Sequence, residues 1–218
     1  MILAVYGAGG LGREILELAE DVNWPVKKFE RFIFIDDYNF GRTINGAPVF
    51  SFEEMQEKYV YQPLKIVIAV GEPYARKMLR DKTLAAGFSL ETLTHPRSLI
   101  SPDAVLGAGC LVCFGAFVST GVELKENVLL QPNCMLGHDT NIGAHSVISP
   151  SANIGGGCVV GSETYIGMGA PVMQGVTIGA RTIVGMGSVV TKDIPDDVIA
   201  FGNPARFMKN NESHKVFG

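Results

Sequence analysis

The sequence predicts two domains of different construction, an α/β domain followed by a parallel β-helix. Up to about residue 95, short apolar runs alternate with helical patterns, which is typical of an α/β domain with a mostly parallel sheet. From residue 100 onward, an aliphatic residue recurs at every sixth position. The segment HPRS at 95–98 separates the two patterns. We therefore expect one domain over residues 1–95 and a second, with a C-terminal tail, over residues 96–218.

The first domain is expected to alternate strands and helices. Its strands are short apolar runs, expected at 2–6, 32–35, 48–50 and 65–70. Its helices are expected in the segments between and after them, at about 10–22, 51–59 and 73–86. Strands joined through helices in this way lie side by side in a mostly parallel sheet.

A glycine-rich loop lies between the first expected strand and the first expected helix. In YGAGGLGRE, Gly7, Gly9 and Gly12 have G-x-G-x-x-G spacing, and Asp36 and Asp37 follow the second strand. Glycines let the backbone approach a diphosphate, and the helix N-terminus supplies N–H groups and a positive dipole. The domain is therefore expected to be Rossmann-like and to bind a nucleotide. Its 95 residues are short for a full dinucleotide fold, and a tight turn without a ligand is the alternative.

The β-helix prediction rests on sixteen positions spaced six residues apart, all of them aliphatic. These are Ile100, Leu106, Val112, Val118, Leu124, Leu130, Leu136, Ile142, Ile148, Ile154, Val160, Ile166, Val172, Ile178, Val184 and Val190. A six-residue unit cannot fold alone, but stacked units can line one continuous core. The residue two places before each aliphatic position is nearly always small or β-branched, and Cys110, Cys134 and Cys158 occupy three of these places.

This periodicity resembles that of the hexapeptide-repeat acyltransferases. The resemblance implies a left-handed β-helix of triangular section with three hexapeptides in each coil, and a little over five coils for this chain. Residues 18 apart would then lie one above the other at about the 4.8 Å spacing of neighbouring strands.

The stacking places His138, in the string LGHDTNIG, next to Gly156 on the following coil. Acyl transfer from a thioester needs a base for the acceptor's proton and a hydrogen-bond donor for the oxyanion. His138 could be the base and the Gly156 N–H the donor. Asp139 could orient the ring or face solvent. A surface histidine without a chemical role is the alternative.

Composition and residue spacing exclude several other functions. The net charge of −4 gives no basic face for nucleic acid, so no nucleic-acid partner is expected. The start lacks a basic leader, and no run of 18 apolar residues occurs, so we expect a cytoplasmic protein without membrane insertion and with reduced cysteines. A zinc site needs at least three ligands, whereas the repeats hold only His138 and His145, so no metal is expected. Cys110 and Cys113 have C-x-x-C spacing, but an inward slot and a turn favour structural roles.

Two longer strings resemble the NeuD and PglD type of sugar acetyltransferase. They are LGHDTNIGAHSVISPSANIGG at 136–156 and TIVGMGSVVTKDIPDDVIAFGNPAR at 182–206. The resemblance implies an acetyl-CoA-dependent enzyme that acetylates an amino or hydroxyl group of a sugar, with His138 as general base and Asp139 as its acidic neighbour. It also implies that the Gly156 amide binds the acetyl-CoA carbonyl. No cysteine or serine is evidently paired with His138, so direct transfer is expected.

The same resemblance implies the ligands and the assembly. The glycine loop would bind a sugar nucleotide, usually UDP-linked, through Gly9, Gly10, Leu11, Asp36, Asp37, Gly71 and Arg76. The family forms homotrimers with acetyl-CoA in the groove between neighbouring β-helices, so the active sites would lie between subunits. Exposed apolar residues at outward positions also favour such an interface. Lys192, Arg206 and Lys209 are candidates for the CoA phosphates, or ordinary surface charges.

The chain departs from its relatives at two positions, which leaves the acceptor open. Val147 stands where relatives often carry a second histidine, for which His145 is a possible substitute, and Leu11 stands where they often have histidine. The acceptor atom is therefore N or O, and the sugar is nucleotide-linked or free. The alternatives are a sialic acid O-acetyltransferase and a non-catalytic trimeric scaffold that senses a nucleotide sugar. A nicotinamide-dependent oxidoreductase is disfavoured.

Overall fold

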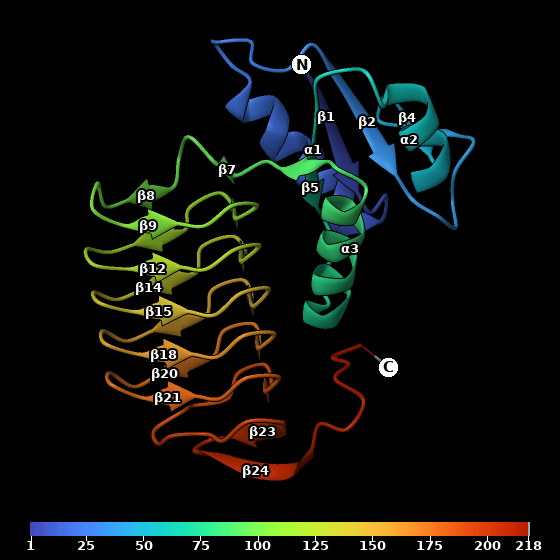
Figure 1. The fold of residues 1–218 in the computed structure, drawn as a ribbon. Coiled ribbons are helices and arrows are strands. Elements are labelled where there is room, and N and C mark those ends of the chain that lie inside the picture. Colours follow the sequence, from blue (N-terminus) through green and yellow to red (C-terminus); the bar gives the residue numbers. More distant parts are fainter. Residues whose placement is uncertain (218) are drawn as a thin grey trace.

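The computed structural model describes residues 1–217, so residue 218, the last of the expected second domain, lies outside it. An α/β domain is followed by a tall stack of short parallel strands (Figure 1). Within residues 1–217, none of the helices combines the length and the apolar character needed to cross a membrane.

The N-terminal domain contains one six-stranded sheet in the order β3-β4-β2-β1-β5-β6. All neighbours are parallel except the β3–β4 hairpin. The strands are β1 (Ile2–Tyr6), β2 (Arg31–Ile35), β3 (Thr43–Ile44), β4 (Ala47–Phe50), β5 (Leu64–Ile68) and β6 (Ser89–Leu90). The mostly parallel sheet expected from the alternating pattern is confirmed. The strand order reverses at β1, since β2 lies on one side of it and β5 on the other, and ligands of such sheets bind at the carboxyl ends of the strands at this point. We call the region at the carboxyl ends of β1 and β5 the crevice.

Three helices cover this sheet: α1 (Gly10–Val22), α2 (Phe52–Tyr59) and α3 (Pro73–Ala85). The start of α2 is fixed by a capping box, in which Ser51 and Glu54 each accept the other's backbone N–H. Phe52, Met55 and Tyr59 of α2 pack on one face of the sheet. The apolar side of α1 belongs to a different core cluster, which extends into the β-helix.

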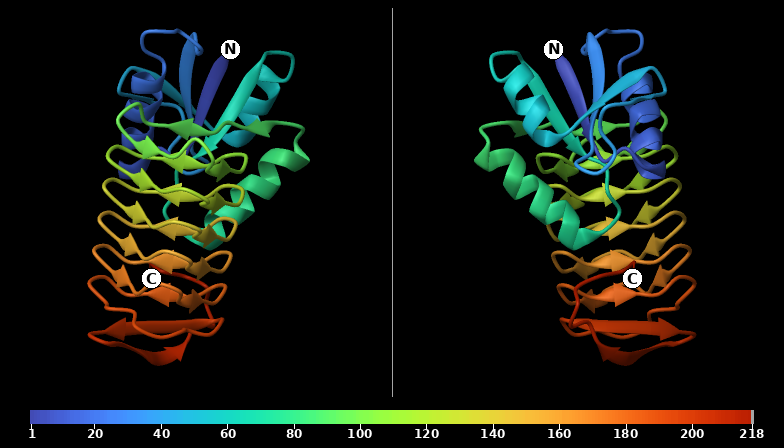
Figure 2. Two further views of the ribbon diagram at one scale, coloured as in Figure 1. Left: turned by 90° about the vertical axis from the view of Figure 1, so that its left-hand side faces the viewer. Right: turned by 90° about the vertical axis from the view of Figure 1, so that its right-hand side faces the viewer.

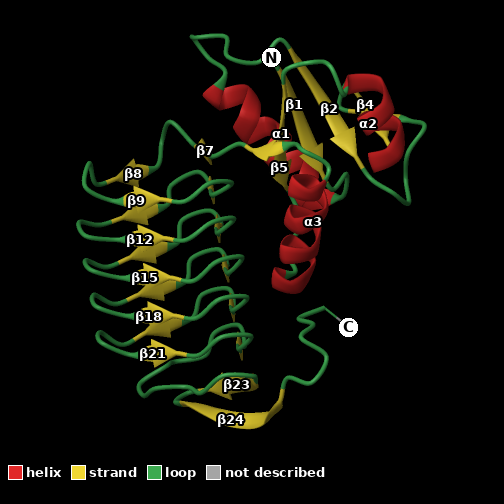
Figure 3. Cartoon of the chain, in the orientation of Figure 1, coloured by secondary structure: helices red, strands yellow, loops and turns green. Residues whose placement is uncertain are grey.

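The second domain is a left-handed β-helix whose strands form three sheets (Figure 3). Their strands pair in parallel, except that the last strand, β24, is antiparallel to β23. The domain-facing sheet contains β7 (Leu93–Thr94), β10 (Leu111–Val112), β13 (Leu129–Leu130), β16 (Val147–Ile148), β19 (Tyr165–Ile166), β22 (Ile183–Val184), β23 (Val198–Gly202) and β24 (Ala205–Asn210). The second sheet contains β8 (Leu99–Ile100), β11 (Phe117–Val118), β14 (Met135–Leu136), β17 (Asn153–Ile154) and β20 (Pro171–Val172). The third sheet contains β9 (Val105–Leu106), β12 (Glu123–Leu124), β15 (Asn141–Ile142), β18 (Val159–Val160) and β21 (Thr177–Ile178).

The stacking of residues 18 apart is confirmed. Met135 pairs with Phe117 on one side and with Asn153 on the other. The offset of 18 continues to the pairing of Val172 with Val190 and shortens to 16 in the last coil, where Ile178 pairs with Ile194. The sixth-position aliphatic residues point into the β-helix, where they are buried except in the first coil, whose Ile100 and Leu106 are partly buried. Cys110, Cys134 and Cys158 are buried among them as free thiols. The inward slots expected for these three cysteines are therefore confirmed.

The N-terminal domain packs on the domain-facing sheet. Figure 2 shows that it lies at the level of the first coils and above them. The outward side chains of four of its strands share a core with α1 and β1: Leu93, Leu111, Leu129 and Val147. Cys113, expected at a turn, is also buried in this interface. The first strand of the β-helix, β7, begins at Leu93, just before the expected boundary after residue 95.

A polar network, Arg76–Asn127–His145, locks the two domains together at the edge where the third sheet meets the domain-facing sheet. Arg76 of α3 is fully buried and donates to the carbonyl oxygens of Asn127 (2.8 and 3.1 Å), Ile68 (2.7 Å) and Val70 (3.1 Å). Asn127 Nδ2 donates in return to the Arg76 carbonyl (3.0 Å) and to His145 Nδ1 (3.1 Å). Burial lowers the pKa of Arg76 to about 10, which still leaves the guanidinium charged at neutral pH.

Replacing Arg76 by leucine should lower the free energy of unfolding by roughly 3 kcal/mol, because several buried carbonyls lose their donor. Urea denaturation measures this loss. Arg80→Leu is the matched control, since its ion pair with Glu126 is partly exposed and should contribute about 1 kcal/mol or less. Equal losses in the two variants would contradict the role given to Arg76.

The stability of the protein should fall as the pH drops from 6.5 to about 4. Burial, with smaller effects of nearby charges, lowers the pKa of His145 from 6.5 to about 4. In this window the unfolded chain takes up a proton that folded His145 does not, so unfolding is favoured by up to roughly 3 kcal/mol. Melting temperatures across this range measure the effect.

The control is His145→Asn, because asparagine does not titrate and tolerates the left-handed backbone at this position (φ 65°). This variant should show a shallower loss of melting temperature between pH 6.5 and 4. An unchanged slope would assign the acid sensitivity to other groups.

Candidate functional site

His138 and Asp139 form a pair on the edge that joins the second sheet to the third, which we call the far edge. It consists of the turns at 102–103, 120–121, 138–139, 156–157, 174–175 and 192–193. His138 Nδ1 lies 2.8 Å from Asp139 Oδ2. The Asp139 backbone is fixed by the preceding coil, because its N–H donates to the Thr120 carbonyl (2.9 Å). The carboxylate thus contacts the imidazole and also faces solvent, the two alternatives that the sequence left open.

Gly156 lies directly against the imidazole on the next coil. A Cβ on Gly156 would be 2.5 Å from His138 Nε2, so only glycine leaves room for the ring. The coils are tied together here because the Gly157 N–H donates to the His138 carbonyl (2.7 Å). Within residues 1–217, the Gly156 N–H itself has no backbone acceptor.

This arrangement suits acid–base chemistry at Nε2. When Nδ1–H donates to Asp139, Nε2 carries the lone pair and can accept a proton. The positive charge that follows is stabilised by the carboxylate. A thioester carbonyl placed at the Gly156 N–H would have a donor for its developing oxyanion next to this base.

The cysteines do not offer a nucleophile for an acyl-enzyme. All four are buried. Burial raises the pKa of Cys110 to about 11 and that of Cys134 to about 12, so neither is a thiolate at neutral pH. Among residues 1–217, no three histidine, cysteine or acidic side chains come together in a group that could hold a metal ion.

Lys192 lies on the far edge, 54 residues after His138. Three coils at the usual strand spacing separate the two by roughly 14 Å. Lys192 and Arg206 line one surface hollow of about 320 Å³, together with Ile194, Pro195 and Phe207. Lys209 lines a different hollow. The structure therefore brings two of the three expected cations together at the end of the edge that carries His138.

The glycine loop has an open N-terminus of α1. Gly7 has a left-handed φ of 112°, and a Cβ on Gly12 would meet the Gly7 carbonyl at 1.9 Å, so both positions require glycine. Gly9 and Gly10 differ, because a Cβ there would meet nothing within 4 Å among residues 1–217. Free space in front of a helix N-terminus is suited to a phosphate.

Asp36 and Asp37 are both engaged within the protein. Asp36 Oδ2 accepts the Ala8 N–H (3.2 Å), which ties the second strand's end to the glycine loop. Asp37 accepts from the Tyr6 hydroxyl, Lys82 Nζ and the Phe52 N–H, each at 2.8 Å. Burial alone would raise the pKa of Asp37, but these hydrogen bonds outweigh it and lower the pKa below its usual value. Asp37 therefore holds β1, α2 and α3 together.

Of the three remaining residues expected to bind the nucleotide, two lie at the crevice and one does not. Leu11 and Gly71 lie close together at the crevice, since a Cβ on Gly71 would be 3.8 Å from Leu11 Cδ2. Arg76, in contrast, is fully buried in the interdomain network and does not reach the crevice. His145 belongs to that network and lies on a different edge from His138.

Sequence reasoning missed three residues near the crevice. Glu72 is the N-cap residue of α3, Tyr165 lies on β19 and Phe217 lies in the C-terminal tail. The Phe217 ring packs on Tyr165 with centroids 5.8 Å apart. Tyr165 and Phe217 belong to no motif that marks a ligand. Glu72 lies in the string VGEPYAR at 70–76, of which only Gly71 and Arg76 were expected to bind the nucleotide.

Two protein families match parts of the chain. Residues 2–83 match the PglD N-terminal domain, and residues 157–192 match the bacterial transferase hexapeptide (six repeats). The chain is 30% identical over 143 residues to GDP-perosamine N-acetyltransferase of Escherichia coli O157:H7. That alignment covers 65% of this chain and 64% of the relative, so it spans slightly less than two thirds of the relative's length.

Solved structures extend the likeness to nearly the whole chain. The acetyltransferase domain of PglB from Neisseria gonorrhoeae FA1090 has a TM-score of 0.88 and 35% identity, covering 95% of this chain and 99% of that one. The same domain has been solved in complex with acetyl coenzyme A. PerB from Caulobacter crescentus, in complex with CoA and GDP-perosamine, has a TM-score of 0.86 and 30% identity, covering 95% and 97%.

Replacing Gly156 by alanine should displace the His138 ring, because the new Cβ would lie 2.5 Å from Nε2. We expect thiol release from acetyl-CoA to fall by roughly two orders of magnitude, and a crystal structure of the variant to show the ring moved. Gly169→Asn is the control, since that turn has open space and asparagine tolerates its left-handed φ. Full activity in Gly156→Ala would contradict the site.

Proposed function

Since the chain belongs to the sugar N-acetyltransferases that combine a PglD N-terminal domain with hexapeptide repeats, we propose that it transfers the acetyl group of acetyl-CoA to the amine of a nucleotide-linked amino sugar. The observation that carries the proposal is the His138–Asp139 pair with Nε2 against the Gly156 backbone. It supplies a base and an oxyanion donor within one small site.

The proposed reaction is direct transfer. The amine nitrogen attacks the thioester carbon while His138 Nε2 takes the amine proton, and the oxyanion is held by the Gly156 N–H. The carbon–sulfur bond then breaks, and the proton passes from His138 to the leaving sulfur of CoA. Asp139 favours the imidazolium that forms between these two steps.

The far edge is the proposed path of acetyl-CoA. Its thioester would lie at His138 and Gly156, and its phosphates would lie at the hollow lined by Lys192 and Arg206. The distance of roughly 14 Å between the two ends suits an extended pantetheine arm lying along three coils.

The proposed acceptor site is the crevice at the glycine loop. The diphosphate would bind at the open α1 N-terminus near Gly9 and Gly10, with the sugar toward Leu11 and Gly71. Asp36 would contribute indirectly, by holding the glycine loop in place through its hydrogen bond from the Ala8 N–H. Relatives are named for GDP-perosamine, whereas the NeuD and PglD resemblance favours UDP. The activity assay therefore includes sugars linked to either nucleotide.

The active site would lie between copies of the chain. The far edge is opposite the domain-facing sheet, and in Figure 1 its turns form the left-hand edge of the β-helix while the N-terminal domain lies to the right. An acceptor in the crevice is separated from His138 of the same chain by the whole section of the β-helix. Exposed apolar residues cover the second sheet and its edges: Leu99, Phe114, Phe117, Met135, Met168, Met173 and Met186. Burial of this surface in a homotrimer would bring a neighbour's crevice to His138.

Replacing His138 by alanine should lower thiol release by roughly two to four orders of magnitude, the usual worth of a general base. Binding of acetyl-CoA should be nearly unchanged. The assay measures thiol release from acetyl-CoA with UDP-linked amino sugars, GDP-perosamine and free sialic acids. His145→Asn, a histidine variant on another edge, should keep wild-type turnover.

Two results would contradict the proposal. Wild-type turnover in His138→Ala would remove this residue as the base. Binding of acetyl-CoA without thiol release for any acceptor would favour the non-catalytic scaffold.

A further inference from the structure

The C-terminal segment 211–217 leaves the end of the β-helix and returns to the N-terminal domain. In Figure 1 it rises from β24 toward the lower end of α3, the end at which Glu72 precedes the helix. It thus connects the last coil with the proposed acceptor site.

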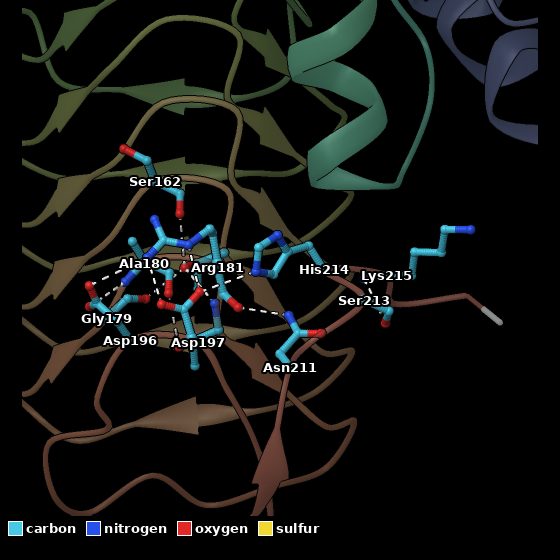
Figure 4. A network of polar contacts seen from close by, with 12 residues as sticks. Ser162, Gly179, Ala180, Arg181, Asp196, Asp197, Asn211, Ser213, His214 and Lys215 are labelled. Carbon is cyan, nitrogen blue, oxygen red and sulfur yellow. Dashed lines mark hydrogen bonds and ion pairs between the residues drawn. The ribbon is translucent and has the colours of Figure 1, made fainter.

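The base of this segment is anchored by the network drawn in Figure 4. Asn211 is buried, its N–H donates to the Asp197 carbonyl and its Nδ2 donates to the Arg181 carbonyl, both at 2.7 Å. Arg181 holds the Asp197 carboxylate through two hydrogen bonds of 2.6 and 2.7 Å, and His214 Nε2 lies 3.3 Å from the same carboxylate. The direction in which the segment leaves the β-helix is therefore fixed.

The other end of the segment is fixed at the crevice. The Glu72 carboxylate accepts the backbone N–H groups of Val216 (2.9 Å) and Phe217 (3.1 Å). The Phe217 ring packs edge-on against Tyr165 of the β-helix, at an interplanar angle of 83°. A Cβ on Gly71 would be 3.8 Å from Phe217 and 3.8 Å from Leu11, so both side chains border the same glycine.

The segment stands beside the crevice and does not fill it. A Cβ added at Gly9 or Gly10 would meet no atom of residues 1–217 within 4 Å, so the diphosphate position stays open. Phe217 is 61% exposed although its backbone is held and its ring has a neighbour. The exposed face of an aromatic ring held in this way can pack against a ligand bound in the crevice.

We propose that segment 211–217 forms one wall of the acceptor site and that Phe217 packs against the sugar ring of the bound nucleotide sugar. This inference rests on the proposed function, because it takes the crevice as the acceptor site. Phe217 and Leu11 would contact the apolar C–H face of the sugar, while the diphosphate is held at the α1 N-terminus without them. Phe217 is thus a specificity-determining residue for the sugar.

The test compares Phe217→Ala with a chain ending at Glu212. In both, KM for the nucleotide amino sugar should rise roughly tenfold, as expected for losing one apolar contact surface, with kcat changed little. KM for acetyl-CoA should be unchanged. By calorimetry, the Kd of the nucleotide sugar should rise by the same factor, whereas the Kd of free UDP or GDP should not change. Phe217→Tyr, which keeps the aromatic ring, should have the wild-type KM and Kd for the nucleotide sugar.

Tyr61→Ala is the matched control, because Tyr61 is an exposed aromatic residue before β5, at the opposite end of the sheet. Unchanged nucleotide-sugar affinity in both tail variants would overturn the inference, and tighter binding would do so as well, since the segment would then be a plug. Calorimetry is independent of turnover. Absence of thiol release from the wild-type protein contradicts the proposed function, whereas equal binding by wild-type and tail variants contradicts this inference alone.

Discussion

The stacking of coils 18 residues apart is the constraint on which the rest of the structure depends. One aliphatic side chain in every hexapeptide points inward, and each buried residue fixes the register of its coil on the next. Residues 18 apart are thereby held at the spacing of neighbouring strands, which is how an exposed histidine and a glycine from different coils form one site. The same rule aligns His138 with Lys192 along the far edge.

The interface between the domains fixes a second relation, the orientation of the crevice. Four outward side chains of the domain-facing sheet share a core with α1. The Arg76–Asn127–His145 network lies at one edge of this interface. A buried guanidinium surrounded by carbonyl oxygens is costly to disrupt, because each of its partners would lose its donor inside the protein. The crevice is therefore held on the side of the β-helix away from His138 of its own chain.

The sequence predicted what repeats and left out what occurs once. The period of six predicts a β-helix with inward cysteines, and the family resemblance adds three hexapeptides per coil. Together they predict the contact of His138 with Gly156, because any residue of the repeats can then be placed by counting. Arg76 looked like a ligand in VGEPYAR, yet its partner Asn127 lies 51 residues away and no pattern marks that pairing. The hydrogen bonds between Glu72 and residues 216–217 span about 145 residues and involve backbone donors, which carry no side-chain signature. Such contacts follow from the packed fold.

The exposure of the proposed base supports a shared active site. In one chain the His138 side chain is 54% exposed and that of Asp139 71%, so water competes for the hydrogen bond that orients the ring. A base and an oxyanion donor are most effective where water is excluded and the local dielectric is low. The exposed methionines and phenylalanines begin next to this edge, so a second copy covering them would also enclose His138. Assembly would thus complete the acceptor site and give the His138–Asp139 pair the dry surroundings that proton transfer requires.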